Sequence, residues 1–80
     1  MSSGLLIAKT VDAMGLKCPE PVMMLHAAIR SVASAECVEL LATDPSTQRD
    51  VGNFCRFLGH EMLVSEDTDA RYRYVIKKGP

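Results

Sequence analysis

The order of apolar and polar positions along the chain predicts four strands. Residues 5–12 are short and rich in apolar and β-branched side chains, and residues 37–43 alternate between two sets that face opposite sides. Residues 60–66 and 71–77 are two further strand-like segments, separated by a polar turn at residues 67–70. Because that turn is tight, we expect the last two strands to pair as an antiparallel hairpin.

Two amphipathic helices are predicted between these strands. Over residues 19–33, apolar side chains recur at three- and four-residue intervals. The second helix is expected to begin with Asp44 as its N-cap and Pro45 at its first helical position, and to end at Gly59. Its apolar stripe consists of Val51, Phe54, Cys55 and Leu58. Each helix therefore has one face to bury.

The element order β-α-β-α-β-β predicts an α+β fold within the broad α/β class. The strands alternate in polarity instead of being apolar throughout. Strands half covered in this way predict a two-layer sandwich, in which a four-stranded mixed sheet carries both helices on one face. The chain has 80 residues, enough for a single domain over residues 1–80, with residues 1–4 frayed at its start.

Composition narrows the class of function. A domain of this size buries about 60–65% of the surface of its unfolded chain, so it has a thin core and little room for an enclosed substrate pocket. The formal net charge of −1 argues against a protein held to nucleic acid by bulk charge. No apolar run approaches the length of a membrane span, and the first residues lack a secretory signal, so we expect a cytoplasmic protein with no membrane partner.

The chain has three cysteines, Cys18, Cys37 and Cys55. An odd number without a secretory signal does not indicate a disulfide framework. The spacing includes no close pair of the kind that zinc sites use, so we expect no metal site. Cys55 lies on an apolar stripe and is expected in the core. Packing is also the favoured role of Cys37, although its place at the start of a strand leaves partial exposure open.

Residues 15–21 read Gly-Leu-Lys-Cys-Pro-Glu-Pro and stand where the first helix is expected to start. Cys18 falls at the N-cap or the first position of that helix. The partial positive charge and unpaired N–H groups of a helix N-terminus favour a thiolate, and Lys17 acts in the same direction. We therefore expect a lowered pKa for Cys18, which Glu20 opposes weakly. A thiolate is the form that attacks sulfur.

The prolines on either side of Glu20 have a separate effect. Pro19 and Pro21 restrict the backbone of the first turn and remove two N–H donors, so that those of Glu20 and Val22 are left to face the sulfur. A stiff turn displays Cys18 in one place, which suits a group handed from protein to protein. The alternative is a small buried hydrophobe. Helix starts prefer Ser, Thr, Asp or Asn, so packing alone explains this cysteine poorly.

A Gly-Leu-x-Cys-Pro-x-Pro segment that enters a helix resembles the signature of the TusA family of sulfur carrier proteins. The resemblance covers about residues 11–79. It includes Asp44-Pro45 with Thr47 and Asp50, Phe54-Cys55, and Tyr72-Arg73-Tyr74.

The resemblance implies a function for Cys18. A cysteine desulfurase would transfer a sulfane sulfur to this cysteine, and the persulfide would pass to a cysteine of an acceptor protein, most commonly for 2-thiolation of the tRNA wobble uridine. Relatives serve sulfur oxidation, molybdenum cofactor supply or selenium metabolism. The transient persulfide replaces any separate cofactor, so the chain would be one link in a sulfurtransferase relay and not an independent enzyme. Such a carrier needs no second catalytic side chain, in agreement with the absence of a paired base near the motif.

Partner contacts are expected on the exposed side of the first helix. Met23 and Met24 point away from the predicted core, and flexible methionines beside a reactive cysteine suit docking to several proteins. A place on the flank of the core is the equal alternative. Arg30 lies on the same side. Asp44 and Asp50 would meet a basic partner if the second helix starts beside the first, although capping is the favoured explanation of Asp44. Because Cys18 must be exposed to two partners in turn, we expect a monomer.

Two other functions remain open. A regulatory or RNA-binding module would use the basic residues near the C-terminus, Arg71, Arg73, Lys77 and Lys78. Direct contact with nucleic acid is not expected, because the tyrosines of this strand alternate to its other side. A thiol redox enzyme would need Cys37 or Cys55 to approach Cys18 as a resolving cysteine. The sequence leaves the donor, the acceptor and the final product unnamed.

Overall fold

The computed structural model describes residues 6–80, so the segment expected to be frayed, residues 1–4, lies outside the described residues. Six elements follow one another along the chain in the expected β-α-β-α-β-β order. They are β1 (Ile7–Ala13), α1 (Glu20–Arg30), β2 (Cys37–Ala42), α2 (Thr47–Leu58), β3 (Glu61–Thr68) and β4 (Arg71–Lys77).

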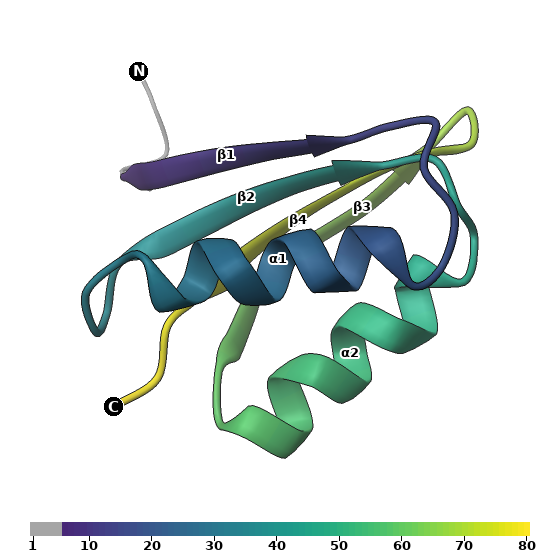
Figure 1. The fold of residues 1–80 in the computed structure, drawn as a ribbon. Helices are drawn as coiled ribbons and strands as arrows, with labels where there is room; N and C mark the ends of the chain where they lie inside the picture. The colour runs from purple at the N-terminus through teal and green to yellow at the C-terminus, as the bar shows by residue number, and fades with distance from the viewer. Residues whose placement is uncertain (1–5) are drawn as a thin grey trace.

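The four strands form one mixed sheet in the order β1-β2-β4-β3. The crossover through α1 makes β1 and β2 parallel, whereas β4 runs antiparallel to both of its neighbours. Both helices cover the same face of this sheet, as Figure 1 shows, with α1 packed on β1 and β2 and α2 on β3 and β4. The predicted two-layer sandwich is confirmed, and no helix of residues 6–80 covers the second face of the sheet.

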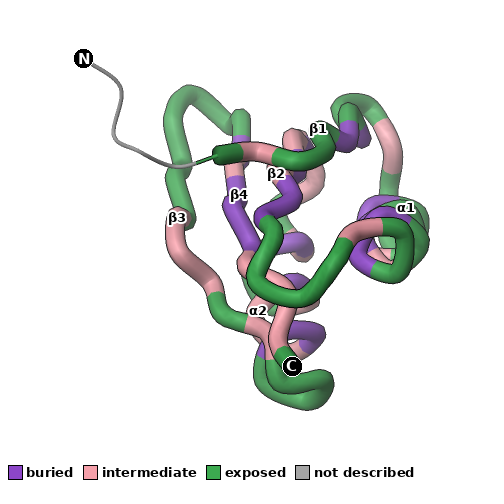
Figure 2. The backbone as a smooth tube through the Cα atoms, turned by 90° about the vertical axis from the view of Figure 1, so that its left-hand side faces the viewer, coloured by how far each residue is buried: buried purple, intermediate pink, exposed green. Residues whose placement is uncertain are grey.

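The core lies between the sheet and the helices. Its strand residues are those of one alternating set, and the register places Val11 beside Leu40 and Leu40 beside Tyr74, all buried. Leu25 of α1 and Val51 of α2 close over them and are fully buried. Figure 2 shows the buried stretches of β2, β4 and both helices turned toward one another. Burying an aliphatic side chain of this kind stabilises the fold by about 1.5–3 kcal/mol.

Helix α1 ends at Arg30, three residues before the end that the periodicity predicts. The carbonyl groups of the last turn find other partners at this point. Ser31 Oγ donates a hydrogen bond to the Ala28 carbonyl at 2.7 Å, and Lys78 Nζ donates to the Val32 carbonyl at 2.7 Å. A serine side chain that bonds to the backbone in this way competes with continued helix.

The start of α2 also differs from the prediction. Its first helical residue is Thr47 and its N-cap is Ser46, so Asp44 and Pro45 lie in the preceding turn and not at the cap and first helical positions. The Thr47 N–H donates to the Asp44 carbonyl three residues back at 3.0 Å, which is a tighter turn than α-helix. The predicted stop is confirmed, because Gly59 adopts a left-handed φ of 77° and ends the helix.

The hairpin between β3 and β4 turns more tightly than expected. Strand β3 continues to Thr68, so residues 67 and 68 belong to the strand, and the turn consists of Asp69 and Ala70. Both turn residues have positive φ, 53° and 61°, as the two-residue turns that match strand twist require.

The open face of the sheet carries a polar ladder that reaches across all four strands. Thr10 Oγ1 donates to Glu39 Oε1 at 3.0 Å, and the Arg73 guanidinium donates to Glu39 and, at 3.3 Å, to Glu66 Oε1. The hydrogen bond from Arg73 holds the pKa of Glu39 below its usual value. These hydrogen-bonded pairs make the open face of the sheet polar. No helix within residues 6–80 has the length and apolarity needed to cross a membrane.

Candidate functional site

Cys18 lies in the loop that connects β1 to α1, one residue before the N-cap residue Pro19 and exposed to solvent. The sequence pattern predicts Cys18 at the N-cap or at the first helical residue, which are one and two positions further along than the structure places it. The Glu20 N–H, which we expected to face the sulfur, donates instead to the Lys17 carbonyl at 3.0 Å. The sulfur is therefore displayed beside the helix N-terminus and finds its polar partners on other elements.

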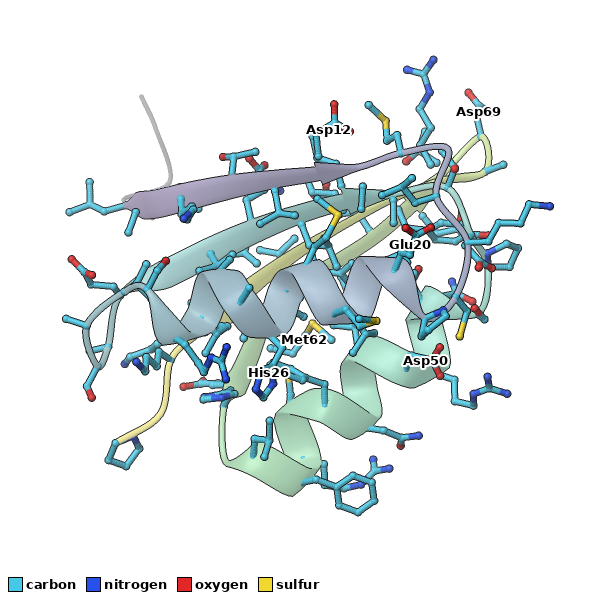
Figure 3. All side chains as sticks on the ribbon, in the orientation of Figure 1. Asp12, Glu20, His26, Asp50, Met62 and Asp69 are labelled. Carbon is cyan, nitrogen blue, oxygen red and sulfur yellow. The ribbon has the colours of Figure 1, made fainter. Side chains whose placement is uncertain are left out.

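One of those partners is Asp50, in the first turn of α2. Cys18 Sγ donates a hydrogen bond to Asp50 Oδ2 at 3.2 Å, and Arg49 Nε donates to the second carboxylate oxygen at 3.1 Å. In Figure 3, Asp50 stands at the start of α2 on the side where the loop into α1 passes. The expectation that no base lies near the motif is wrong. Thirty-two positions separate the two residues, and only the packing of α2 beside α1 brings them together.

Asp44 holds the backbone of the same loop. Its Oδ2 accepts a hydrogen bond from the Cys18 N–H at 2.7 Å, and its Oδ1 accepts one from the Ser46 N–H at 3.0 Å. These two backbone hydrogen bonds, with a smaller contribution from the charge of Lys17, hold the pKa of Asp44 below its usual value. A charged Asp44 thus ties the turn before α2 to the loop before α1.

The carboxylates reverse the expected effect on the thiol. The hydrogen bond to Asp50 is the largest of several influences that raise the pKa of Cys18, followed by desolvation and by the negative charges of Asp50 and Asp44. The hydroxyl of Ser46 acts in the opposite direction and is outweighed. The prediction of a lowered pKa is therefore wrong for the free protein. A negative charge beside an acid disfavours its ionised form, so the resting Cys18 is a thiol at neutral pH.

A shallow groove of about 410 Å³ opens beside Cys18. The cysteine and Asp50 stand at its polar end, while most of the other lining side chains are apolar. The groove is lined by Cys18, Pro19, Val22, Asp50, Asn53, Phe54, Phe57 and Leu58. Leu58 was expected in the core but is 49% exposed, and Phe57 is 78% exposed. Periodicity alone does not mark Phe57, because it lies off the apolar stripe of α2.

Three of the four residues predicted to meet partners are spread along α1, and the fourth, Asp44, precedes α2. Met23 projects into solvent with 62% of its surface exposed. Met24 leans toward the edge strand, where it lines a hollow with Thr10 and other residues of β1. Arg30 is exposed at the C-terminal end of the helix, at the far end from Cys18. Of this set, Asp44 alone contacts Cys18 directly.

Cys37 and Cys55 are both buried. Burial raises the pKa of Cys55 to about 11, which leaves it unreactive near neutral pH. Cys37 opens β2 at the end of the sheet where β1 begins, whereas Cys18 follows the other end of β1, about 20 Å away at the rise of a strand. Cys37 is therefore too far from Cys18 to resolve it after oxidation, and Cys55 is buried with a raised pKa. Within the described residues, no group of three His, Cys, Asp or Glu side chains is arranged to hold a metal ion.

Comparison with known proteins places this geometry in a family. The family profile described as "Sulfurtransferase TusA" matches residues 9–78. A protein named "Sulfur carrier protein TusA" from Pseudomonas putida is 52% identical over 68 residues, which is 85% of each chain. Its namesake from Pseudomonas entomophila is 52% identical over 69 residues, 86% of each chain.

A solved structure has the same fold. The SirA-like protein from Desulfitobacterium hafniense matches with a TM-score of 0.79 and 22% identity, over 90% of this chain and 99% of that one. At this identity the likeness concerns the fold alone. The family profile and the two relatives decide the class, and the chain belongs to the TusA sulfurtransferase family.

Proposed function

We propose that Cys18 carries sulfur as a persulfide between a cysteine desulfurase and an acceptor protein. The observation that carries this proposal is the placement of Cys18. It is the exposed thiol among the three, it stands in the Cys-Pro-x-Pro segment, and an open apolar groove lies beside it. The proteins that are 52% identical to this chain are named sulfur carriers.

The transfer consists of two exchanges at sulfur. In the first, the Cys18 thiolate attacks the outer sulfur of the donor's cysteine persulfide, the donor S–S bond breaks, and the donor cysteine leaves as a thiolate. In the second, an acceptor thiolate attacks the outer sulfur of the Cys18 persulfide, and Cys18 leaves as a thiolate. Each exchange forms one S–S bond and breaks another, so neither needs an oxidant or a cofactor. The chain is thus a link in a relay and depends on both partners.

The most common product of such a relay is 2-thiouridine at the tRNA wobble position, and we propose it for this chain. The proposal also includes a monomeric carrier in the cytoplasm, where free thiols stay reduced, with no direct contact to nucleic acid. Partners would approach over the surface that contains Met23, Met24, Arg30 and Asp44, close to Lys17 and Glu20. Sulfur oxidation, molybdenum cofactor supply and selenium metabolism are the alternative destinations of the sulfur.

The RNA-binding alternative finds less support. Arg73 of the basic strand is paired with Glu39 and Glu66, and Lys78 is engaged by the Val32 carbonyl. Two of the four basic side chains are therefore already occupied within the protein. Electrostatic binding to nucleic acid needs unpaired Lys or Arg side chains, which neutralise phosphates and so release the counterions of the nucleic acid.

Intact-protein mass spectrometry tests the sulfur site. The protein, a Cys18→Ser variant and a Cys37→Ala variant are each incubated with a cysteine desulfurase and cysteine. We expect the protein and Cys37→Ala to gain the mass of one or more sulfur atoms, which a reductant removes, and Cys18→Ser to gain none. An equal gain in Cys18→Ser would overturn the proposal.

The proposed product needs a separate experiment in cells that lack their own carrier. Expression of the protein should restore 2-thiouridine in hydrolysed tRNA, whereas Cys18→Ser should not. If the protein is loaded by the desulfurase but restores no thiouridine, the tRNA assignment is wrong and another destination of the sulfur takes its place.

A further inference from the structure

The polar contact made by the Cys18 sulfur is unusual for a group that has to act as a nucleophile. Within residues 6–80, the Cys18 sulfur donates its hydrogen bond to Asp50, at 3.2 Å, and the weaker influence of the Ser46 hydroxyl does not outweigh it. Asp44 faces the same loop, but its oxygens are occupied by the backbone N–H groups of Cys18 and Ser46. A carboxylate, and not a cation, therefore meets the reacting atom.

The position of Asp50 is set by the helix on which it lies. It belongs to the first turn of α2, and its side chain is only 20% exposed. Arg49 occupies the other carboxylate oxygen, but the Arg49 side chain is 72% exposed, so its charge is largely screened by water. Lys17 is the other cation near the loop, and its charge lowers the pKa of Asp44. The negative charge on Asp50 thus reaches the sulfur with little compensation from the protein itself.

We propose that Asp50 is a positioning residue that holds Cys18 as a protonated thiol in the free carrier and restrains sulfur transfer until a partner brings a cation to it. The inference rests on the proposed function and adds a control step to it. The partner group has a defined chemistry, a guanidinium or ammonium that reaches the polar end of the groove and pairs with the Asp50 carboxylate.

One carboxylate restrains both exchanges, because Cys18 takes part in each of them as a thiolate. On loading, the thiol must first lose its proton to solvent, and a carboxylate beside it lowers the fraction that has done so. On release, Cys18 is the leaving group, and a thiol with a higher pKa leaves more slowly. A cation paired with Asp50 cancels its charge and favours the thiolate in both steps. Sulfur would therefore be transferred while a partner protein is bound, and it would stay on Cys18 while the carrier is free.

The first test measures the titration of Cys18 without any donor. Alkylation by iodoacetamide is followed by intact mass from about pH 6 to about pH 10, a range that spans thiol ionisation. We expect Asp50→Asn to move the midpoint to lower pH. Near neutral pH the thiolate fraction should then rise about tenfold for every pH unit by which the midpoint falls. Because a thiolate with a lower pKa is a weaker nucleophile, alkylation should be faster by about threefold per unit. Asp50→Glu keeps a carboxylate and should stay close to the original profile.

Asp69→Asn is the matched control for the loss of one negative charge. Asp69 lies in the β3–β4 turn with positive φ, which asparagine tolerates, and it makes no contribution to the titration of Cys18. Its profile should superimpose on that of the original protein. Circular dichroism checks that each variant is folded. A profile for folded Asp50→Asn that also superimposes on the original would overturn the proposal.

The second test concerns Cys18 as a leaving group. The protein and its Asp50→Asn variant are loaded with inorganic polysulfide and then treated with cyanide, which attacks the outer sulfur and releases thiocyanate and the Cys18 thiolate. Thiocyanate should form severalfold faster from Asp50→Asn, and an equal or slower rate would contradict the inference. Neither test uses a desulfurase. Failure of enzymatic loading would therefore overturn the proposed carrier function, while these two measurements still decide the role of Asp50.

Discussion

At the scale of single residues, Cys18 differs from the other two cysteines in both exposure and polar neighbours. Its side chain is exposed and bonded to Asp50, whereas Cys37 and Cys55 are buried in apolar surroundings. Burial removes access for a reagent, and it also suppresses the thiolate, as the pKa of about 11 for Cys55 shows. One thiol of the three is therefore available to chemistry in the folded protein.

This difference predicts the result of a thiol titration. A disulfide reagent at mildly alkaline pH should modify Cys18 in the native protein and leave Cys37 and Cys55 unmodified until a denaturant is added. Cys18→Ser should show no reactive thiol in the native protein and two after a denaturant is added. Two fast thiols in the native protein would contradict the burial of Cys37 or Cys55. Mass spectrometry of peptides identifies the sites.

The sequence predicts Cys18 as the reactive residue but does not predict the direction in which its pKa moves. Lys17 and Glu20 are neighbours in the chain and can be weighed from the sequence. Asp50 is distant in the sequence and reaches the sulfur only because α2 starts beside α1. The sequence places Asp44 and Asp50 at the start of the second helix, where both are candidate contacts for a basic partner. Their hydrogen bonds with Cys18 emerge only from tertiary packing.

At the scale of elements, the start of α2 is fixed to the sheet by a buried hydrogen bond. Thr47 Oγ1 donates its one hydrogen to the Asp44 carbonyl at 2.7 Å, so it accepts a hydrogen bond from Tyr74 Oη of β4 at 2.9 Å. Both Thr47 and Tyr74 are almost fully buried. The contact therefore connects the middle of the sheet to the residue that holds the Cys18 backbone.

Substitution of the two partners should have unequal effects on stability. Tyr74→Phe removes one hydroxyl but leaves Thr47 bonded to Asp44, so we expect the free energy of unfolding to fall by about 1 kcal/mol. Thr47→Val strands the buried Tyr74 hydroxyl without a partner, so we expect a larger loss, up to about 3 kcal/mol. Urea denaturation followed by circular dichroism measures both.

The double variant Thr47→Val/Tyr74→Phe separates this explanation from simple loss of packing. It leaves no stranded hydroxyl, so its stability should equal or exceed that of Thr47→Val alone. Additive losses from the two single substitutions would show that the hydrogen bond is not what couples α2 to β4.

Periodicity predicts the six helices and strands themselves more securely than it predicts the residues at which they begin and end. All six were found in the expected order, because each has an apolar set that the sheet or a helix must bury. The ends depend on contacts that the sequence does not reveal. Lys78, which follows β4, donates a hydrogen bond to the Val32 carbonyl beyond α1, and Leu58 is exposed although it lies on the apolar stripe of α2.

At the scale of the whole molecule, the two faces of the sheet have different chemistry. The open face carries the ladder that joins Thr10, Glu39, Arg73 and Glu66. The helical side carries Cys18, the apolar groove and several large apolar side chains that solvent reaches. Exposed apolar side chains grouped around one reactive atom are typical of a protein interaction site. We therefore expect both partners of the relay to approach the helical side.

Met23 offers the clearest test of that orientation, because it is exposed on α1 five positions after Cys18 and contributes nothing to the buried core. Met23→Gln should leave the free energy of unfolding within about 0.5 kcal/mol, yet raise the KM of the desulfurase for the carrier roughly five- to tenfold, as loss of an apolar anchor does. Met14, 44% exposed in the turn after β1, supplies the matched variant Met14→Gln, which should leave the KM unchanged. Equal effects of the two substitutions would mean that the donor does not dock on the exposed side of α1, and the contact surface would then have to be sought elsewhere around Cys18.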